Sequence, residues 1–121
     1  MTELSGIQLL HASIERVWNE RDDAVRLRAI GDLYQPNAVI YEPDRAVTGH
    51  KEICDVVRDV LKGMPNGFRF EISGPSSEHH GIAITRWRGT VGGEVTVSGS
   101  DVARVENGLI GDHYFFFDPK E

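Results

Sequence analysis

The sequence contains one long alternating run, Glu94-Val95-Thr96-Val97-Ser98-Gly99-Ser100-Asp101-Val102-Ala103-Arg104-Val105. Alternation of apolar and polar residues predicts a strand with one buried and one solvated face. Parity places Asp101 on the apolar face, where Gly99 opens space beside it. Burial disfavours the charged form of a carboxyl group and can raise its pKa by up to ~3–5 units. We therefore expect Asp101 to act as a proton donor or base near neutral pH, unless the strand frays and the carboxyl reaches water.

Length and charge limit the possible classes of protein. The chain has 121 residues, enough for one domain (1–121) with a real core and too few for two. Its formal net charge is −6 and no basic stripe is present, so we expect no nucleic-acid partner. No apolar run approaches the ~20 residues of a membrane span, and no signal-peptide core follows Met1. The single cysteine, Cys54, excludes an internal disulfide and predicts a cytoplasmic location.

The periodicity changes from helical to strand-like along the chain. Apolar residues at helical spacing predict helices over about 4–21, about 22–34 and about 50–62. Strands are expected at 38–42, 68–72, about 79–91, 94–105 and about 109–117. The dipeptides Gly92-Gly93 and Asn107-Gly108 are hairpin signals. Helices followed by an antiparallel meander predict an α+β fold, with the sheet curled around the long helix.

Several segments form a recognisable series in their order and spacing. They are Trp18-Asn19-Glu20-Arg21-Asp22, Asp32-Leu33-Tyr34, Ala38-Val39-Ile40-Tyr41-Glu42-Pro43, Gly49, Gly99-Ser100-Asp101-Val102 and Asn107-Gly108-Leu109-Ile110. From about residue 5 to Asp118 the chain thus resembles the SnoaL-like polyketide cyclase and ketosteroid isomerase branch of the NTF2-like superfamily. The resemblance implies a cone in which a curved antiparallel sheet wraps around three N-terminal helices. It also implies a deep apolar pocket and homodimers formed through the outer sheet face.

The resemblance implies roles for two carboxyl groups. In the ketosteroid isomerases a carboxylate at the end of the first strand shuttles the proton, and Glu42 before Pro43 matches it. A neutral aspartic acid on the penultimate strand donates to the enolate, and Asp101 matches that position. In the SnoaL-like cyclases a pocket aspartate acts as acid and base without metal or cofactor, a role for which Asp101 is the candidate. The isomerases' oxyanion tyrosine on the first helix has no counterpart here, where Ile14 or His11 falls nearby.

The first hairpin decides which residues surround Asp101, because a register slip of one residue exchanges the faces of a strand. A two-residue turn at Gly92-Gly93 would place Ile84 opposite Asp101 and bring Arg86 and Arg88 into the pocket. A three-residue loop would place Thr85 opposite Asp101 and line the pocket with His79, Ala83 and Trp87. Burying two unpaired guanidinium groups would cost several kcal/mol each. We therefore expect Trp87 to point inward and the arginines outward.

The second hairpin leaves the same ambiguity. A two-residue turn would place Tyr114 opposite Asp101, and a three-residue loop with Gly108 in a bulge would place His113 there. The family resemblance favours an inward face that holds His113, Phe115 and Phe117. Either partner would hydrogen-bond the carboxyl group, and a nearby imidazolium would lower its pKa.

These arguments define the candidate site. The predicted catalytic residues are Asp101, Glu42 and His113. The predicted substrate-binding residues are Trp87, Trp18, Ile14, His79, Tyr114, Phe115 and Phe117. We expect a pocket closed at its narrow end by the tryptophans and phenylalanines, which binds a flat apolar molecule rather than a nucleotide or sugar. No cofactor is expected. No metal is expected either, because the adjacent His79 and His80 should point to opposite faces of a strand.

Three functions remain open from the sequence. The first is a cofactor-independent isomerase or aldol-type cyclase that moves a proton next to a carbonyl group of a small apolar molecule, such as a polyketide or steroid. The second is a non-catalytic module that binds a small ligand or takes part in assembly. The third is a limonene-type epoxide hydrolase, which requires Arg86 or Arg88 to face Asp101. Apolar residues on both faces of the last strands also predict a homodimer through the outer sheet face.

Overall fold

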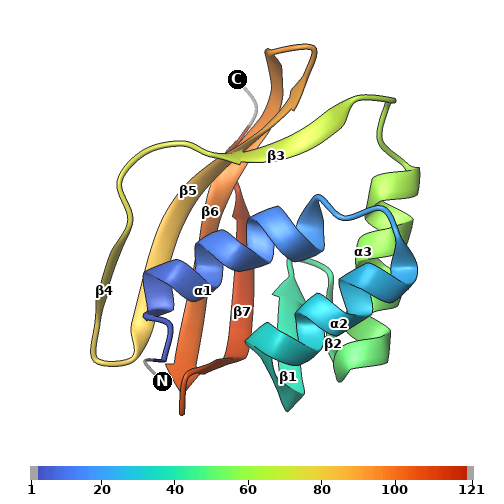
Figure 1. The fold of residues 1–121 in the computed structure, drawn as a ribbon. Helices are drawn as coiled ribbons and strands as arrows, with labels where there is room; N and C mark the ends of the chain where they lie inside the picture. Colours follow the sequence, from blue (N-terminus) through green and yellow to red (C-terminus); the bar gives the residue numbers. More distant parts are fainter. Residues whose placement is uncertain (1–2, 120–121) are drawn as a thin grey trace.

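The computed structural model describes residues 3–119. The elements in chain order are α1 (Gly6–Ser13), η1 (Ile14–Trp18), α2 (Asp23–Leu33), β1 (Tyr34–Glu42), β2 (Arg45–Thr48), α3 (His50–Lys62), β3 (Phe68–Ile72), β4 (Ser77–His79), β5 (Ile82–Val91), β6 (Glu94–Glu106) and β7 (Leu109–Phe117). Figure 1 shows α1 crossing one face of β5, β6 and β7, with α2 and α3 beside β1 and β2. The expected α+β class is confirmed. Within the described range no helix is long and apolar enough to cross a membrane.

The sheet is mixed rather than antiparallel. Its strand order is β2-β1-β7-β6-β5-β3, and β4 pairs with β5 beside this path. Strands β1 and β7 are parallel, with Ile40 aligned with His113. The sequence-based expectation of an antiparallel sheet is therefore wrong at this pair. A parallel pair needs a long crossover between its strands, and α3 with β3–β6 supplies it.

The first long helix changes its winding halfway. Ser5 caps its start through a capping box with Gln8, and α-helical hydrogen bonding continues to Ser13. From Ile14 to Trp18 the helix is a π-helix rather than the α-helix expected over 4–21. Short π segments occur mostly as local bulges in α-helices, often at functional sites. Both Ile14 and Trp18, the ends of this segment, line the main cavity described below.

A bulge sets the register of the first hairpin. Gly92-Gly93 is a two-residue turn, because Val91 pairs with Glu94. The register then shifts at Thr96, so that Gly89 pairs with Val97 and Thr85 lies opposite Asp101. The expected partner of Asp101 and the inward orientation of Trp87 are thus confirmed. The expected three-residue loop is wrong, since an extra residue within β6 produces the same shift.

A second bulge sets the register of the last strand. Glu106 pairs with Leu109 across a two-residue turn, and the register shifts at Gly111. As a result Phe115 lies opposite Asp101, which contradicts both sequence-based alternatives, Tyr114 and His113. His113 lies opposite Ala103, on the same inner face as Asp101 and diagonal to it. The inward face therefore holds His113 and Phe115, as the family resemblance implied.

Candidate active site

One large cavity lies inside the cone, with a volume of about 430 Å³. Its walls come from the first helix, the end of α3 and the inner face of the sheet. The residues that line it are Ile14, Trp18, Glu42, Val60, Met64, Pro65, Phe70, Trp87, Thr96, Val97, Asp101, Phe115 and Phe117. Most of these side chains are apolar, so the few polar groups among them will orient any ligand.

Asp101 is the buried acid of this cavity. It lies near the middle of β6 and is only 2% exposed. Its Oδ2 atom lies 2.9 Å from Nε2 of His113, whose side chain is fully buried. Its Oδ1 atom is buried and has no hydrogen-bond partner among the described residues. The carboxyl group is therefore held through Oδ2, while the hydrogen-bonding capacity of Oδ1 is not used by the described residues.

A buried chain of hydrogen bonds continues behind His113. The Nδ1 atom of His113 lies 2.7 Å from the hydroxyl of Tyr34, which lies 2.6 Å from Oγ of Ser13. Burial raises the pKa of Tyr34 well above its usual value, against the opposing effects of Ser13 and Trp18. Tyr34 is therefore a neutral phenol near neutral pH, able to donate its proton to Nδ1 of His113. With Nδ1 as acceptor, a neutral imidazole carries its proton on Nε2 and donates it to Asp101.

Glu42 lies at the end of β1 and also lines the cavity. Its side chain is 13% exposed and forms an ion pair with Arg45 across the turn to β2. The two carboxyl groups predicted to be catalytic, Asp101 and Glu42, thus border the same cavity. An enzyme requires such convergence, whereas a binding or assembly module would tolerate scattered carboxyl groups.

The predicted substrate-binding residues divide into two groups. Five of them line the cavity: Ile14, Trp18, Trp87, Phe115 and Phe117. Tyr114 does not, because the bulge at Gly111 turns it to the outer face, where it stacks on Tyr41. His79 does not either, because β4 is a short exposed strand beside β5.

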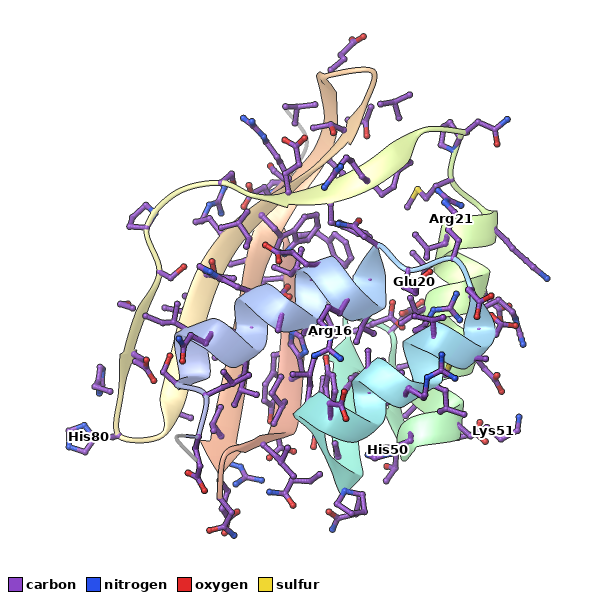
Figure 2. The ribbon with its side chains drawn as sticks, viewed as in Figure 1. Arg16, Glu20, Arg21, His50, Lys51 and His80 are labelled. Carbon is purple, nitrogen blue, oxygen red and sulfur yellow. The ribbon has the colours of Figure 1, made fainter. Side chains whose placement is uncertain are left out.

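The two adjacent histidines, His79 and His80, do not point to opposite faces of a strand as expected. His80 adopts a positive φ of 51° in the turn after β4, so it does not continue the strand. The rings of His79 and His80 therefore approach each other, with 3.0 Å between their Nδ1 atoms, instead of pointing to opposite faces. Figure 2 shows His80 at this turn, between β4 and β5. Across residues 3–119 no group of three or more His, Cys, Asp or Glu residues is arranged to hold a metal ion.

The arginines of β5 point away from the cavity. Arg86 forms a bidentate ion pair with Asp118 and also bonds Ser100. Arg88 pairs with Glu71 on β3. The condition for a limonene-type epoxide hydrolase, an arginine facing Asp101, is therefore not met.

Sequence reasoning missed the residues behind the acid and much of the cavity wall. Tyr34 and Ser13 complete the hydrogen-bond chain, although the sequence marks Tyr34 only through the family resemblance. Tyr34 directly follows the apolar residues of a predicted helix, so burial could be expected. A buried tyrosine hydroxyl usually needs a hydrogen-bond partner, and this was the signal that could have identified the residue. The remaining wall residues are Val60, Met64, Pro65, Phe70, Thr96 and Val97.

Comparisons with known proteins agree with this fold. A protein of the SnoaL-like family from Agrobacterium tumefaciens, described as a proposed isomerase, is 23% identical with a TM-score of 0.86, over 93% of this chain and 97% of its own. A proposed SnoaL-like polyketide cyclase from Jannaschia sp. is 13% identical with a TM-score of 0.71, over 98% and 92% of the two chains. A proposed ketosteroid isomerase from Kribbella flavida is 15% identical with a TM-score of 0.70, over 93% and 77%.

An NTF2-like protein from Cytophaga hutchinsonii is 14% identical with a TM-score of 0.70, over 98% of this chain and 94% of its own. Together these structures establish the NTF2-like fold. No curated protein sequence matches the chain. The sequence model of the SnoaL-like domain matches residues 10–113, which include Asp101, His113 and Tyr34. The chain therefore belongs to the SnoaL-like family.

Proposed function

We propose that the protein is a cofactor-independent enzyme that moves a proton next to the carbonyl group of a small apolar molecule. The observation that carries the proposal is the environment of Asp101. The carboxyl group is buried in an apolar cavity of about 430 Å³, held through one oxygen by His113 and unpartnered at the other among the described residues. In an apolar cavity few water molecules compete with the carboxylate as acceptors of the substrate proton.

The proton transfer follows from this geometry. Oδ1 of Asp101 takes a proton from the carbon next to the carbonyl group, and the electrons of the broken C–H bond form an enolate. The protonated acid then returns the proton to another carbon, which gives an isomer. Alternatively, the enolate carbon attacks a second carbonyl group of the same molecule, whose C=O electrons move to the oxygen. The resulting alkoxide takes the proton back from Asp101, which gives an aldol-type ring and restores the carboxylate. His113 and Tyr34 hold the acid in place during either reaction.

Glu42 is the second proton carrier in this proposal. It borders the same cavity, but its carboxylate is already paired with Arg45 and it lies at the end of a strand. Asp101 is therefore the first base, and Glu42 acts on another polar group of the substrate. Family members described as isomerases and cyclases support both outcomes of the shared first step.

Exchange of substrate hydrogen tests the proposal before the natural substrate is known. In deuterated water the protein should speed the replacement of the α-hydrogens of 2-tetralone, a flat apolar ketone, as followed by proton NMR. Asp101→Asn should abolish this exchange. The matched control is Asp112→Asn, which changes an aspartate on the outer face that pairs with Arg104 and should leave exchange intact. Retained exchange in Asp101→Asn would refute the assigned base. Tight ketone binding without exchange by the wild type would favour the binding module.

A further inference from the structure

Three buried polar atoms have no hydrogen-bond partner among the described residues. They are Nε1 of Trp18, Nε1 of Trp87 and Oδ1 of Asp101. All three residues line the same cavity. Buried polar atoms are nearly always hydrogen-bonded in native proteins, so unpartnered atoms gathered around one cavity point to a ligand that pairs with them. The set offers N–H donors next to one carboxyl acceptor.

The two indole groups differ in their surroundings. Trp18 lies next to the buried hydrogen-bond chain, since its indole acts on the Tyr34 hydroxyl and partly opposes the rise in pKa that burial causes. Neither indole N–H forms a hydrogen bond with the described residues, and no comparable hydroxyl is found to interact with Trp87. It lies on β5, directly opposite Gly99 of β6. The donor that most needs a partner from a ligand is therefore that of Trp87.

Gly99 brings the Trp87 ring toward Asp101. A Cβ atom at Gly99 would lie 2.6 Å from Cζ2 and 3.0 Å from Cε2 of Trp87, so this edge of the indole covers the glycine. The Cε2 atom is bonded to Nε1, the donor itself. Gly99 and Asp101 are two residues apart on the same face of one strand, a separation of about 7 Å. The edge of the indole that carries Nε1 and the Asp101 carboxyl group therefore belong to neighbouring positions of the inner sheet face, and both residues line the cavity.

Packing fixes the Trp87 ring in this position. Phe70 packs against it in an edge-to-face arrangement with ring centres 5.5 Å apart, and Phe117 packs in the same way at 5.7 Å. The residue is 3% exposed. A donor that is held rigidly in an apolar site loses little free energy to reorganisation when charge develops on its partner.

We propose that Nε1–H of Trp87 donates a hydrogen bond to the carbonyl oxygen of the substrate, and so stabilises the enolate that Asp101 generates. This inference rests on the proposed function and deepens it. It assigns a hydrogen-bond donor to the carbonyl oxygen of the substrate. In the ketosteroid isomerases that the sequence resembles, a tyrosine on the first helix has this role, and this chain has no tyrosine there. It also defines the ligand as an apolar molecule whose carbonyl oxygen and acidic carbon reach Trp87 and Asp101 together.

The chain contains only two tryptophans, which makes the hydrogen bond directly observable. Protein labelled with ¹⁵N on the indole nitrogens should give two indole N–H signals, assigned with Trp18→Phe and Trp87→Phe. The probe is 2-tetralone, and the matched control is tetralin, a hydrocarbon of similar shape without the oxygen. We expect the Trp87 proton signal to move downfield with the ketone and not with tetralin, because only the ketone accepts a hydrogen bond.

The NMR result is independent of catalysis. It should persist in Asp101→Asn, so failure of the proposed base and failure of the Trp87 contact can be told apart. Equal shifts with both ligands, a ketone shift confined to Trp18, or no saturable shift with the ketone up to its solubility limit would each overturn the inference.

Kinetics provide the second measurement. Loss of one rigid donor to a developing oxyanion typically costs about 10²–10³-fold in kcat. Trp87→Phe should therefore reduce the maximal rate of hydrogen exchange by about this factor, while the KM changes little because the apolar ring is kept. Trp18→Phe is the matched control and should reduce the rate much less. An equal reduction of the maximal rate in the two variants, or a change in KM without a change in the maximal rate, would contradict the assignment.

Discussion

The Asp101 carboxyl and the His113 imidazole lie 2.9 Å apart on neighbouring strands, although they are not opposite each other in the sheet. Asp101 faces Phe115, and His113 faces Ala103. Their side chains meet diagonally across the inner face, where both are almost fully buried. A buried charged group is costly unless it is paired and hydrogen-bonded, so each of the two side chains depends on the other.

Removal of His113 should be strongly destabilising. In His113→Phe, Oδ2 of Asp101 loses its partner, whereas the Tyr34 hydroxyl loses one of two partners and keeps Ser13. An unsatisfied buried group costs about 1–3 kcal/mol, and more when it is charged. We expect a loss of about 3 kcal/mol in the free energy of unfolding, measured by denaturant titration. The double variant Asp101→Leu/His113→Phe should recover part of this loss because no charge remains buried. Additive effects of the two single changes would contradict the coupling.

Tyr34 should make the protein sensitive to alkali. Burial raises the pKa of this tyrosine in the folded state above the value near 10.0 expected when it is unfolded. A raised folded pKa gives stability that is fully present below the unfolded pKa and is lost as pH rises toward the folded one. The wild type should thus lose stability above about pH 10, whereas Tyr34→Phe should lose less over the same range. Denaturant melts at several alkaline pH values would measure the difference, and parallel curves for the two proteins would refute it.

Asp118 should contribute stability that disappears in acid. Hydrogen bonds from Arg86 and Ser98 lower the pKa of its carboxyl group to about 2. A lowered folded pKa gives stability that is present above the unfolded value of 3.8 and is lost as pH falls toward the folded one. Asp118→Asn should therefore be less stable than the wild type near neutral pH and approach it between about pH 4 and pH 2. Thermal melts across this range test the prediction, and a difference that does not change with pH would oppose it.

Two glycines should respond in opposite ways to alanine. A Cβ atom at Gly99 would lie 2.0 Å from the backbone oxygen of Phe116, so Gly99→Ala should cost about 3 kcal/mol, the upper end of the usual range for overpacking. Gly31 lies in α2, where an added Cβ atom would have no neighbour within 4 Å, and Gly31→Ala should stabilise by about 0.5–1 kcal/mol through helix propensity. Urea titration measures both. A tolerated Gly99→Ala would contradict the close approach of the Phe116 backbone oxygen and the Trp87 ring to this glycine.

The outer sheet face should form a homodimer interface. Ile84, Tyr114 and Phe116 lie there with exposed fractions of 42%, 39% and 55%. Exposed apolar groups on a sheet face favour a second covering layer. Light scattering should give about twice the chain mass of 13.5 kDa, and Phe116→Asp should reduce it to a single chain. A monomeric wild type at micromolar concentration would exclude this interface.

Much of the fold could be predicted because its signals are local. The boundaries of α3, β3 and β7 follow from periodicity and from the glycines and prolines that end the apolar stripes. Strand β2 was missed because only four residues form it and a single half-buried valine, Val47, marks its inner side. The parallel pairing of β1 with β7 was missed because no local pattern records which distant strand closes a sheet.

The candidate site was harder to predict because it depends on two bulges. Turn dipeptides indicate loop length, but a bulge inside a strand changes the register without altering the turn. At Thr96 the sequence carries no distinct sign of it. At Gly111 the sequence does carry a sign, because a glycine inside a strand often marks a bulge. The structure gives the reason, since a Cβ atom at this position would collide with the guanidinium of Arg104. That sign would have placed Phe115, rather than Tyr114 or His113, opposite Asp101.

The parallel pairing of β1 with β7 also has a consequence for how the protein folds. It makes the hydrogen bond between Tyr34 and His113 span 79 residues of the chain, whereas the capping of α1 spans three. Contacts between residues distant in sequence carry a large loop-closure entropy and slow folding. The helices and the β5–β6 hairpin can therefore form early, as a ribosome releases them, while the acid acquires its histidine only when the last strand docks. Formation of the Asp101–His113 pair and completion of folding are then a single late event.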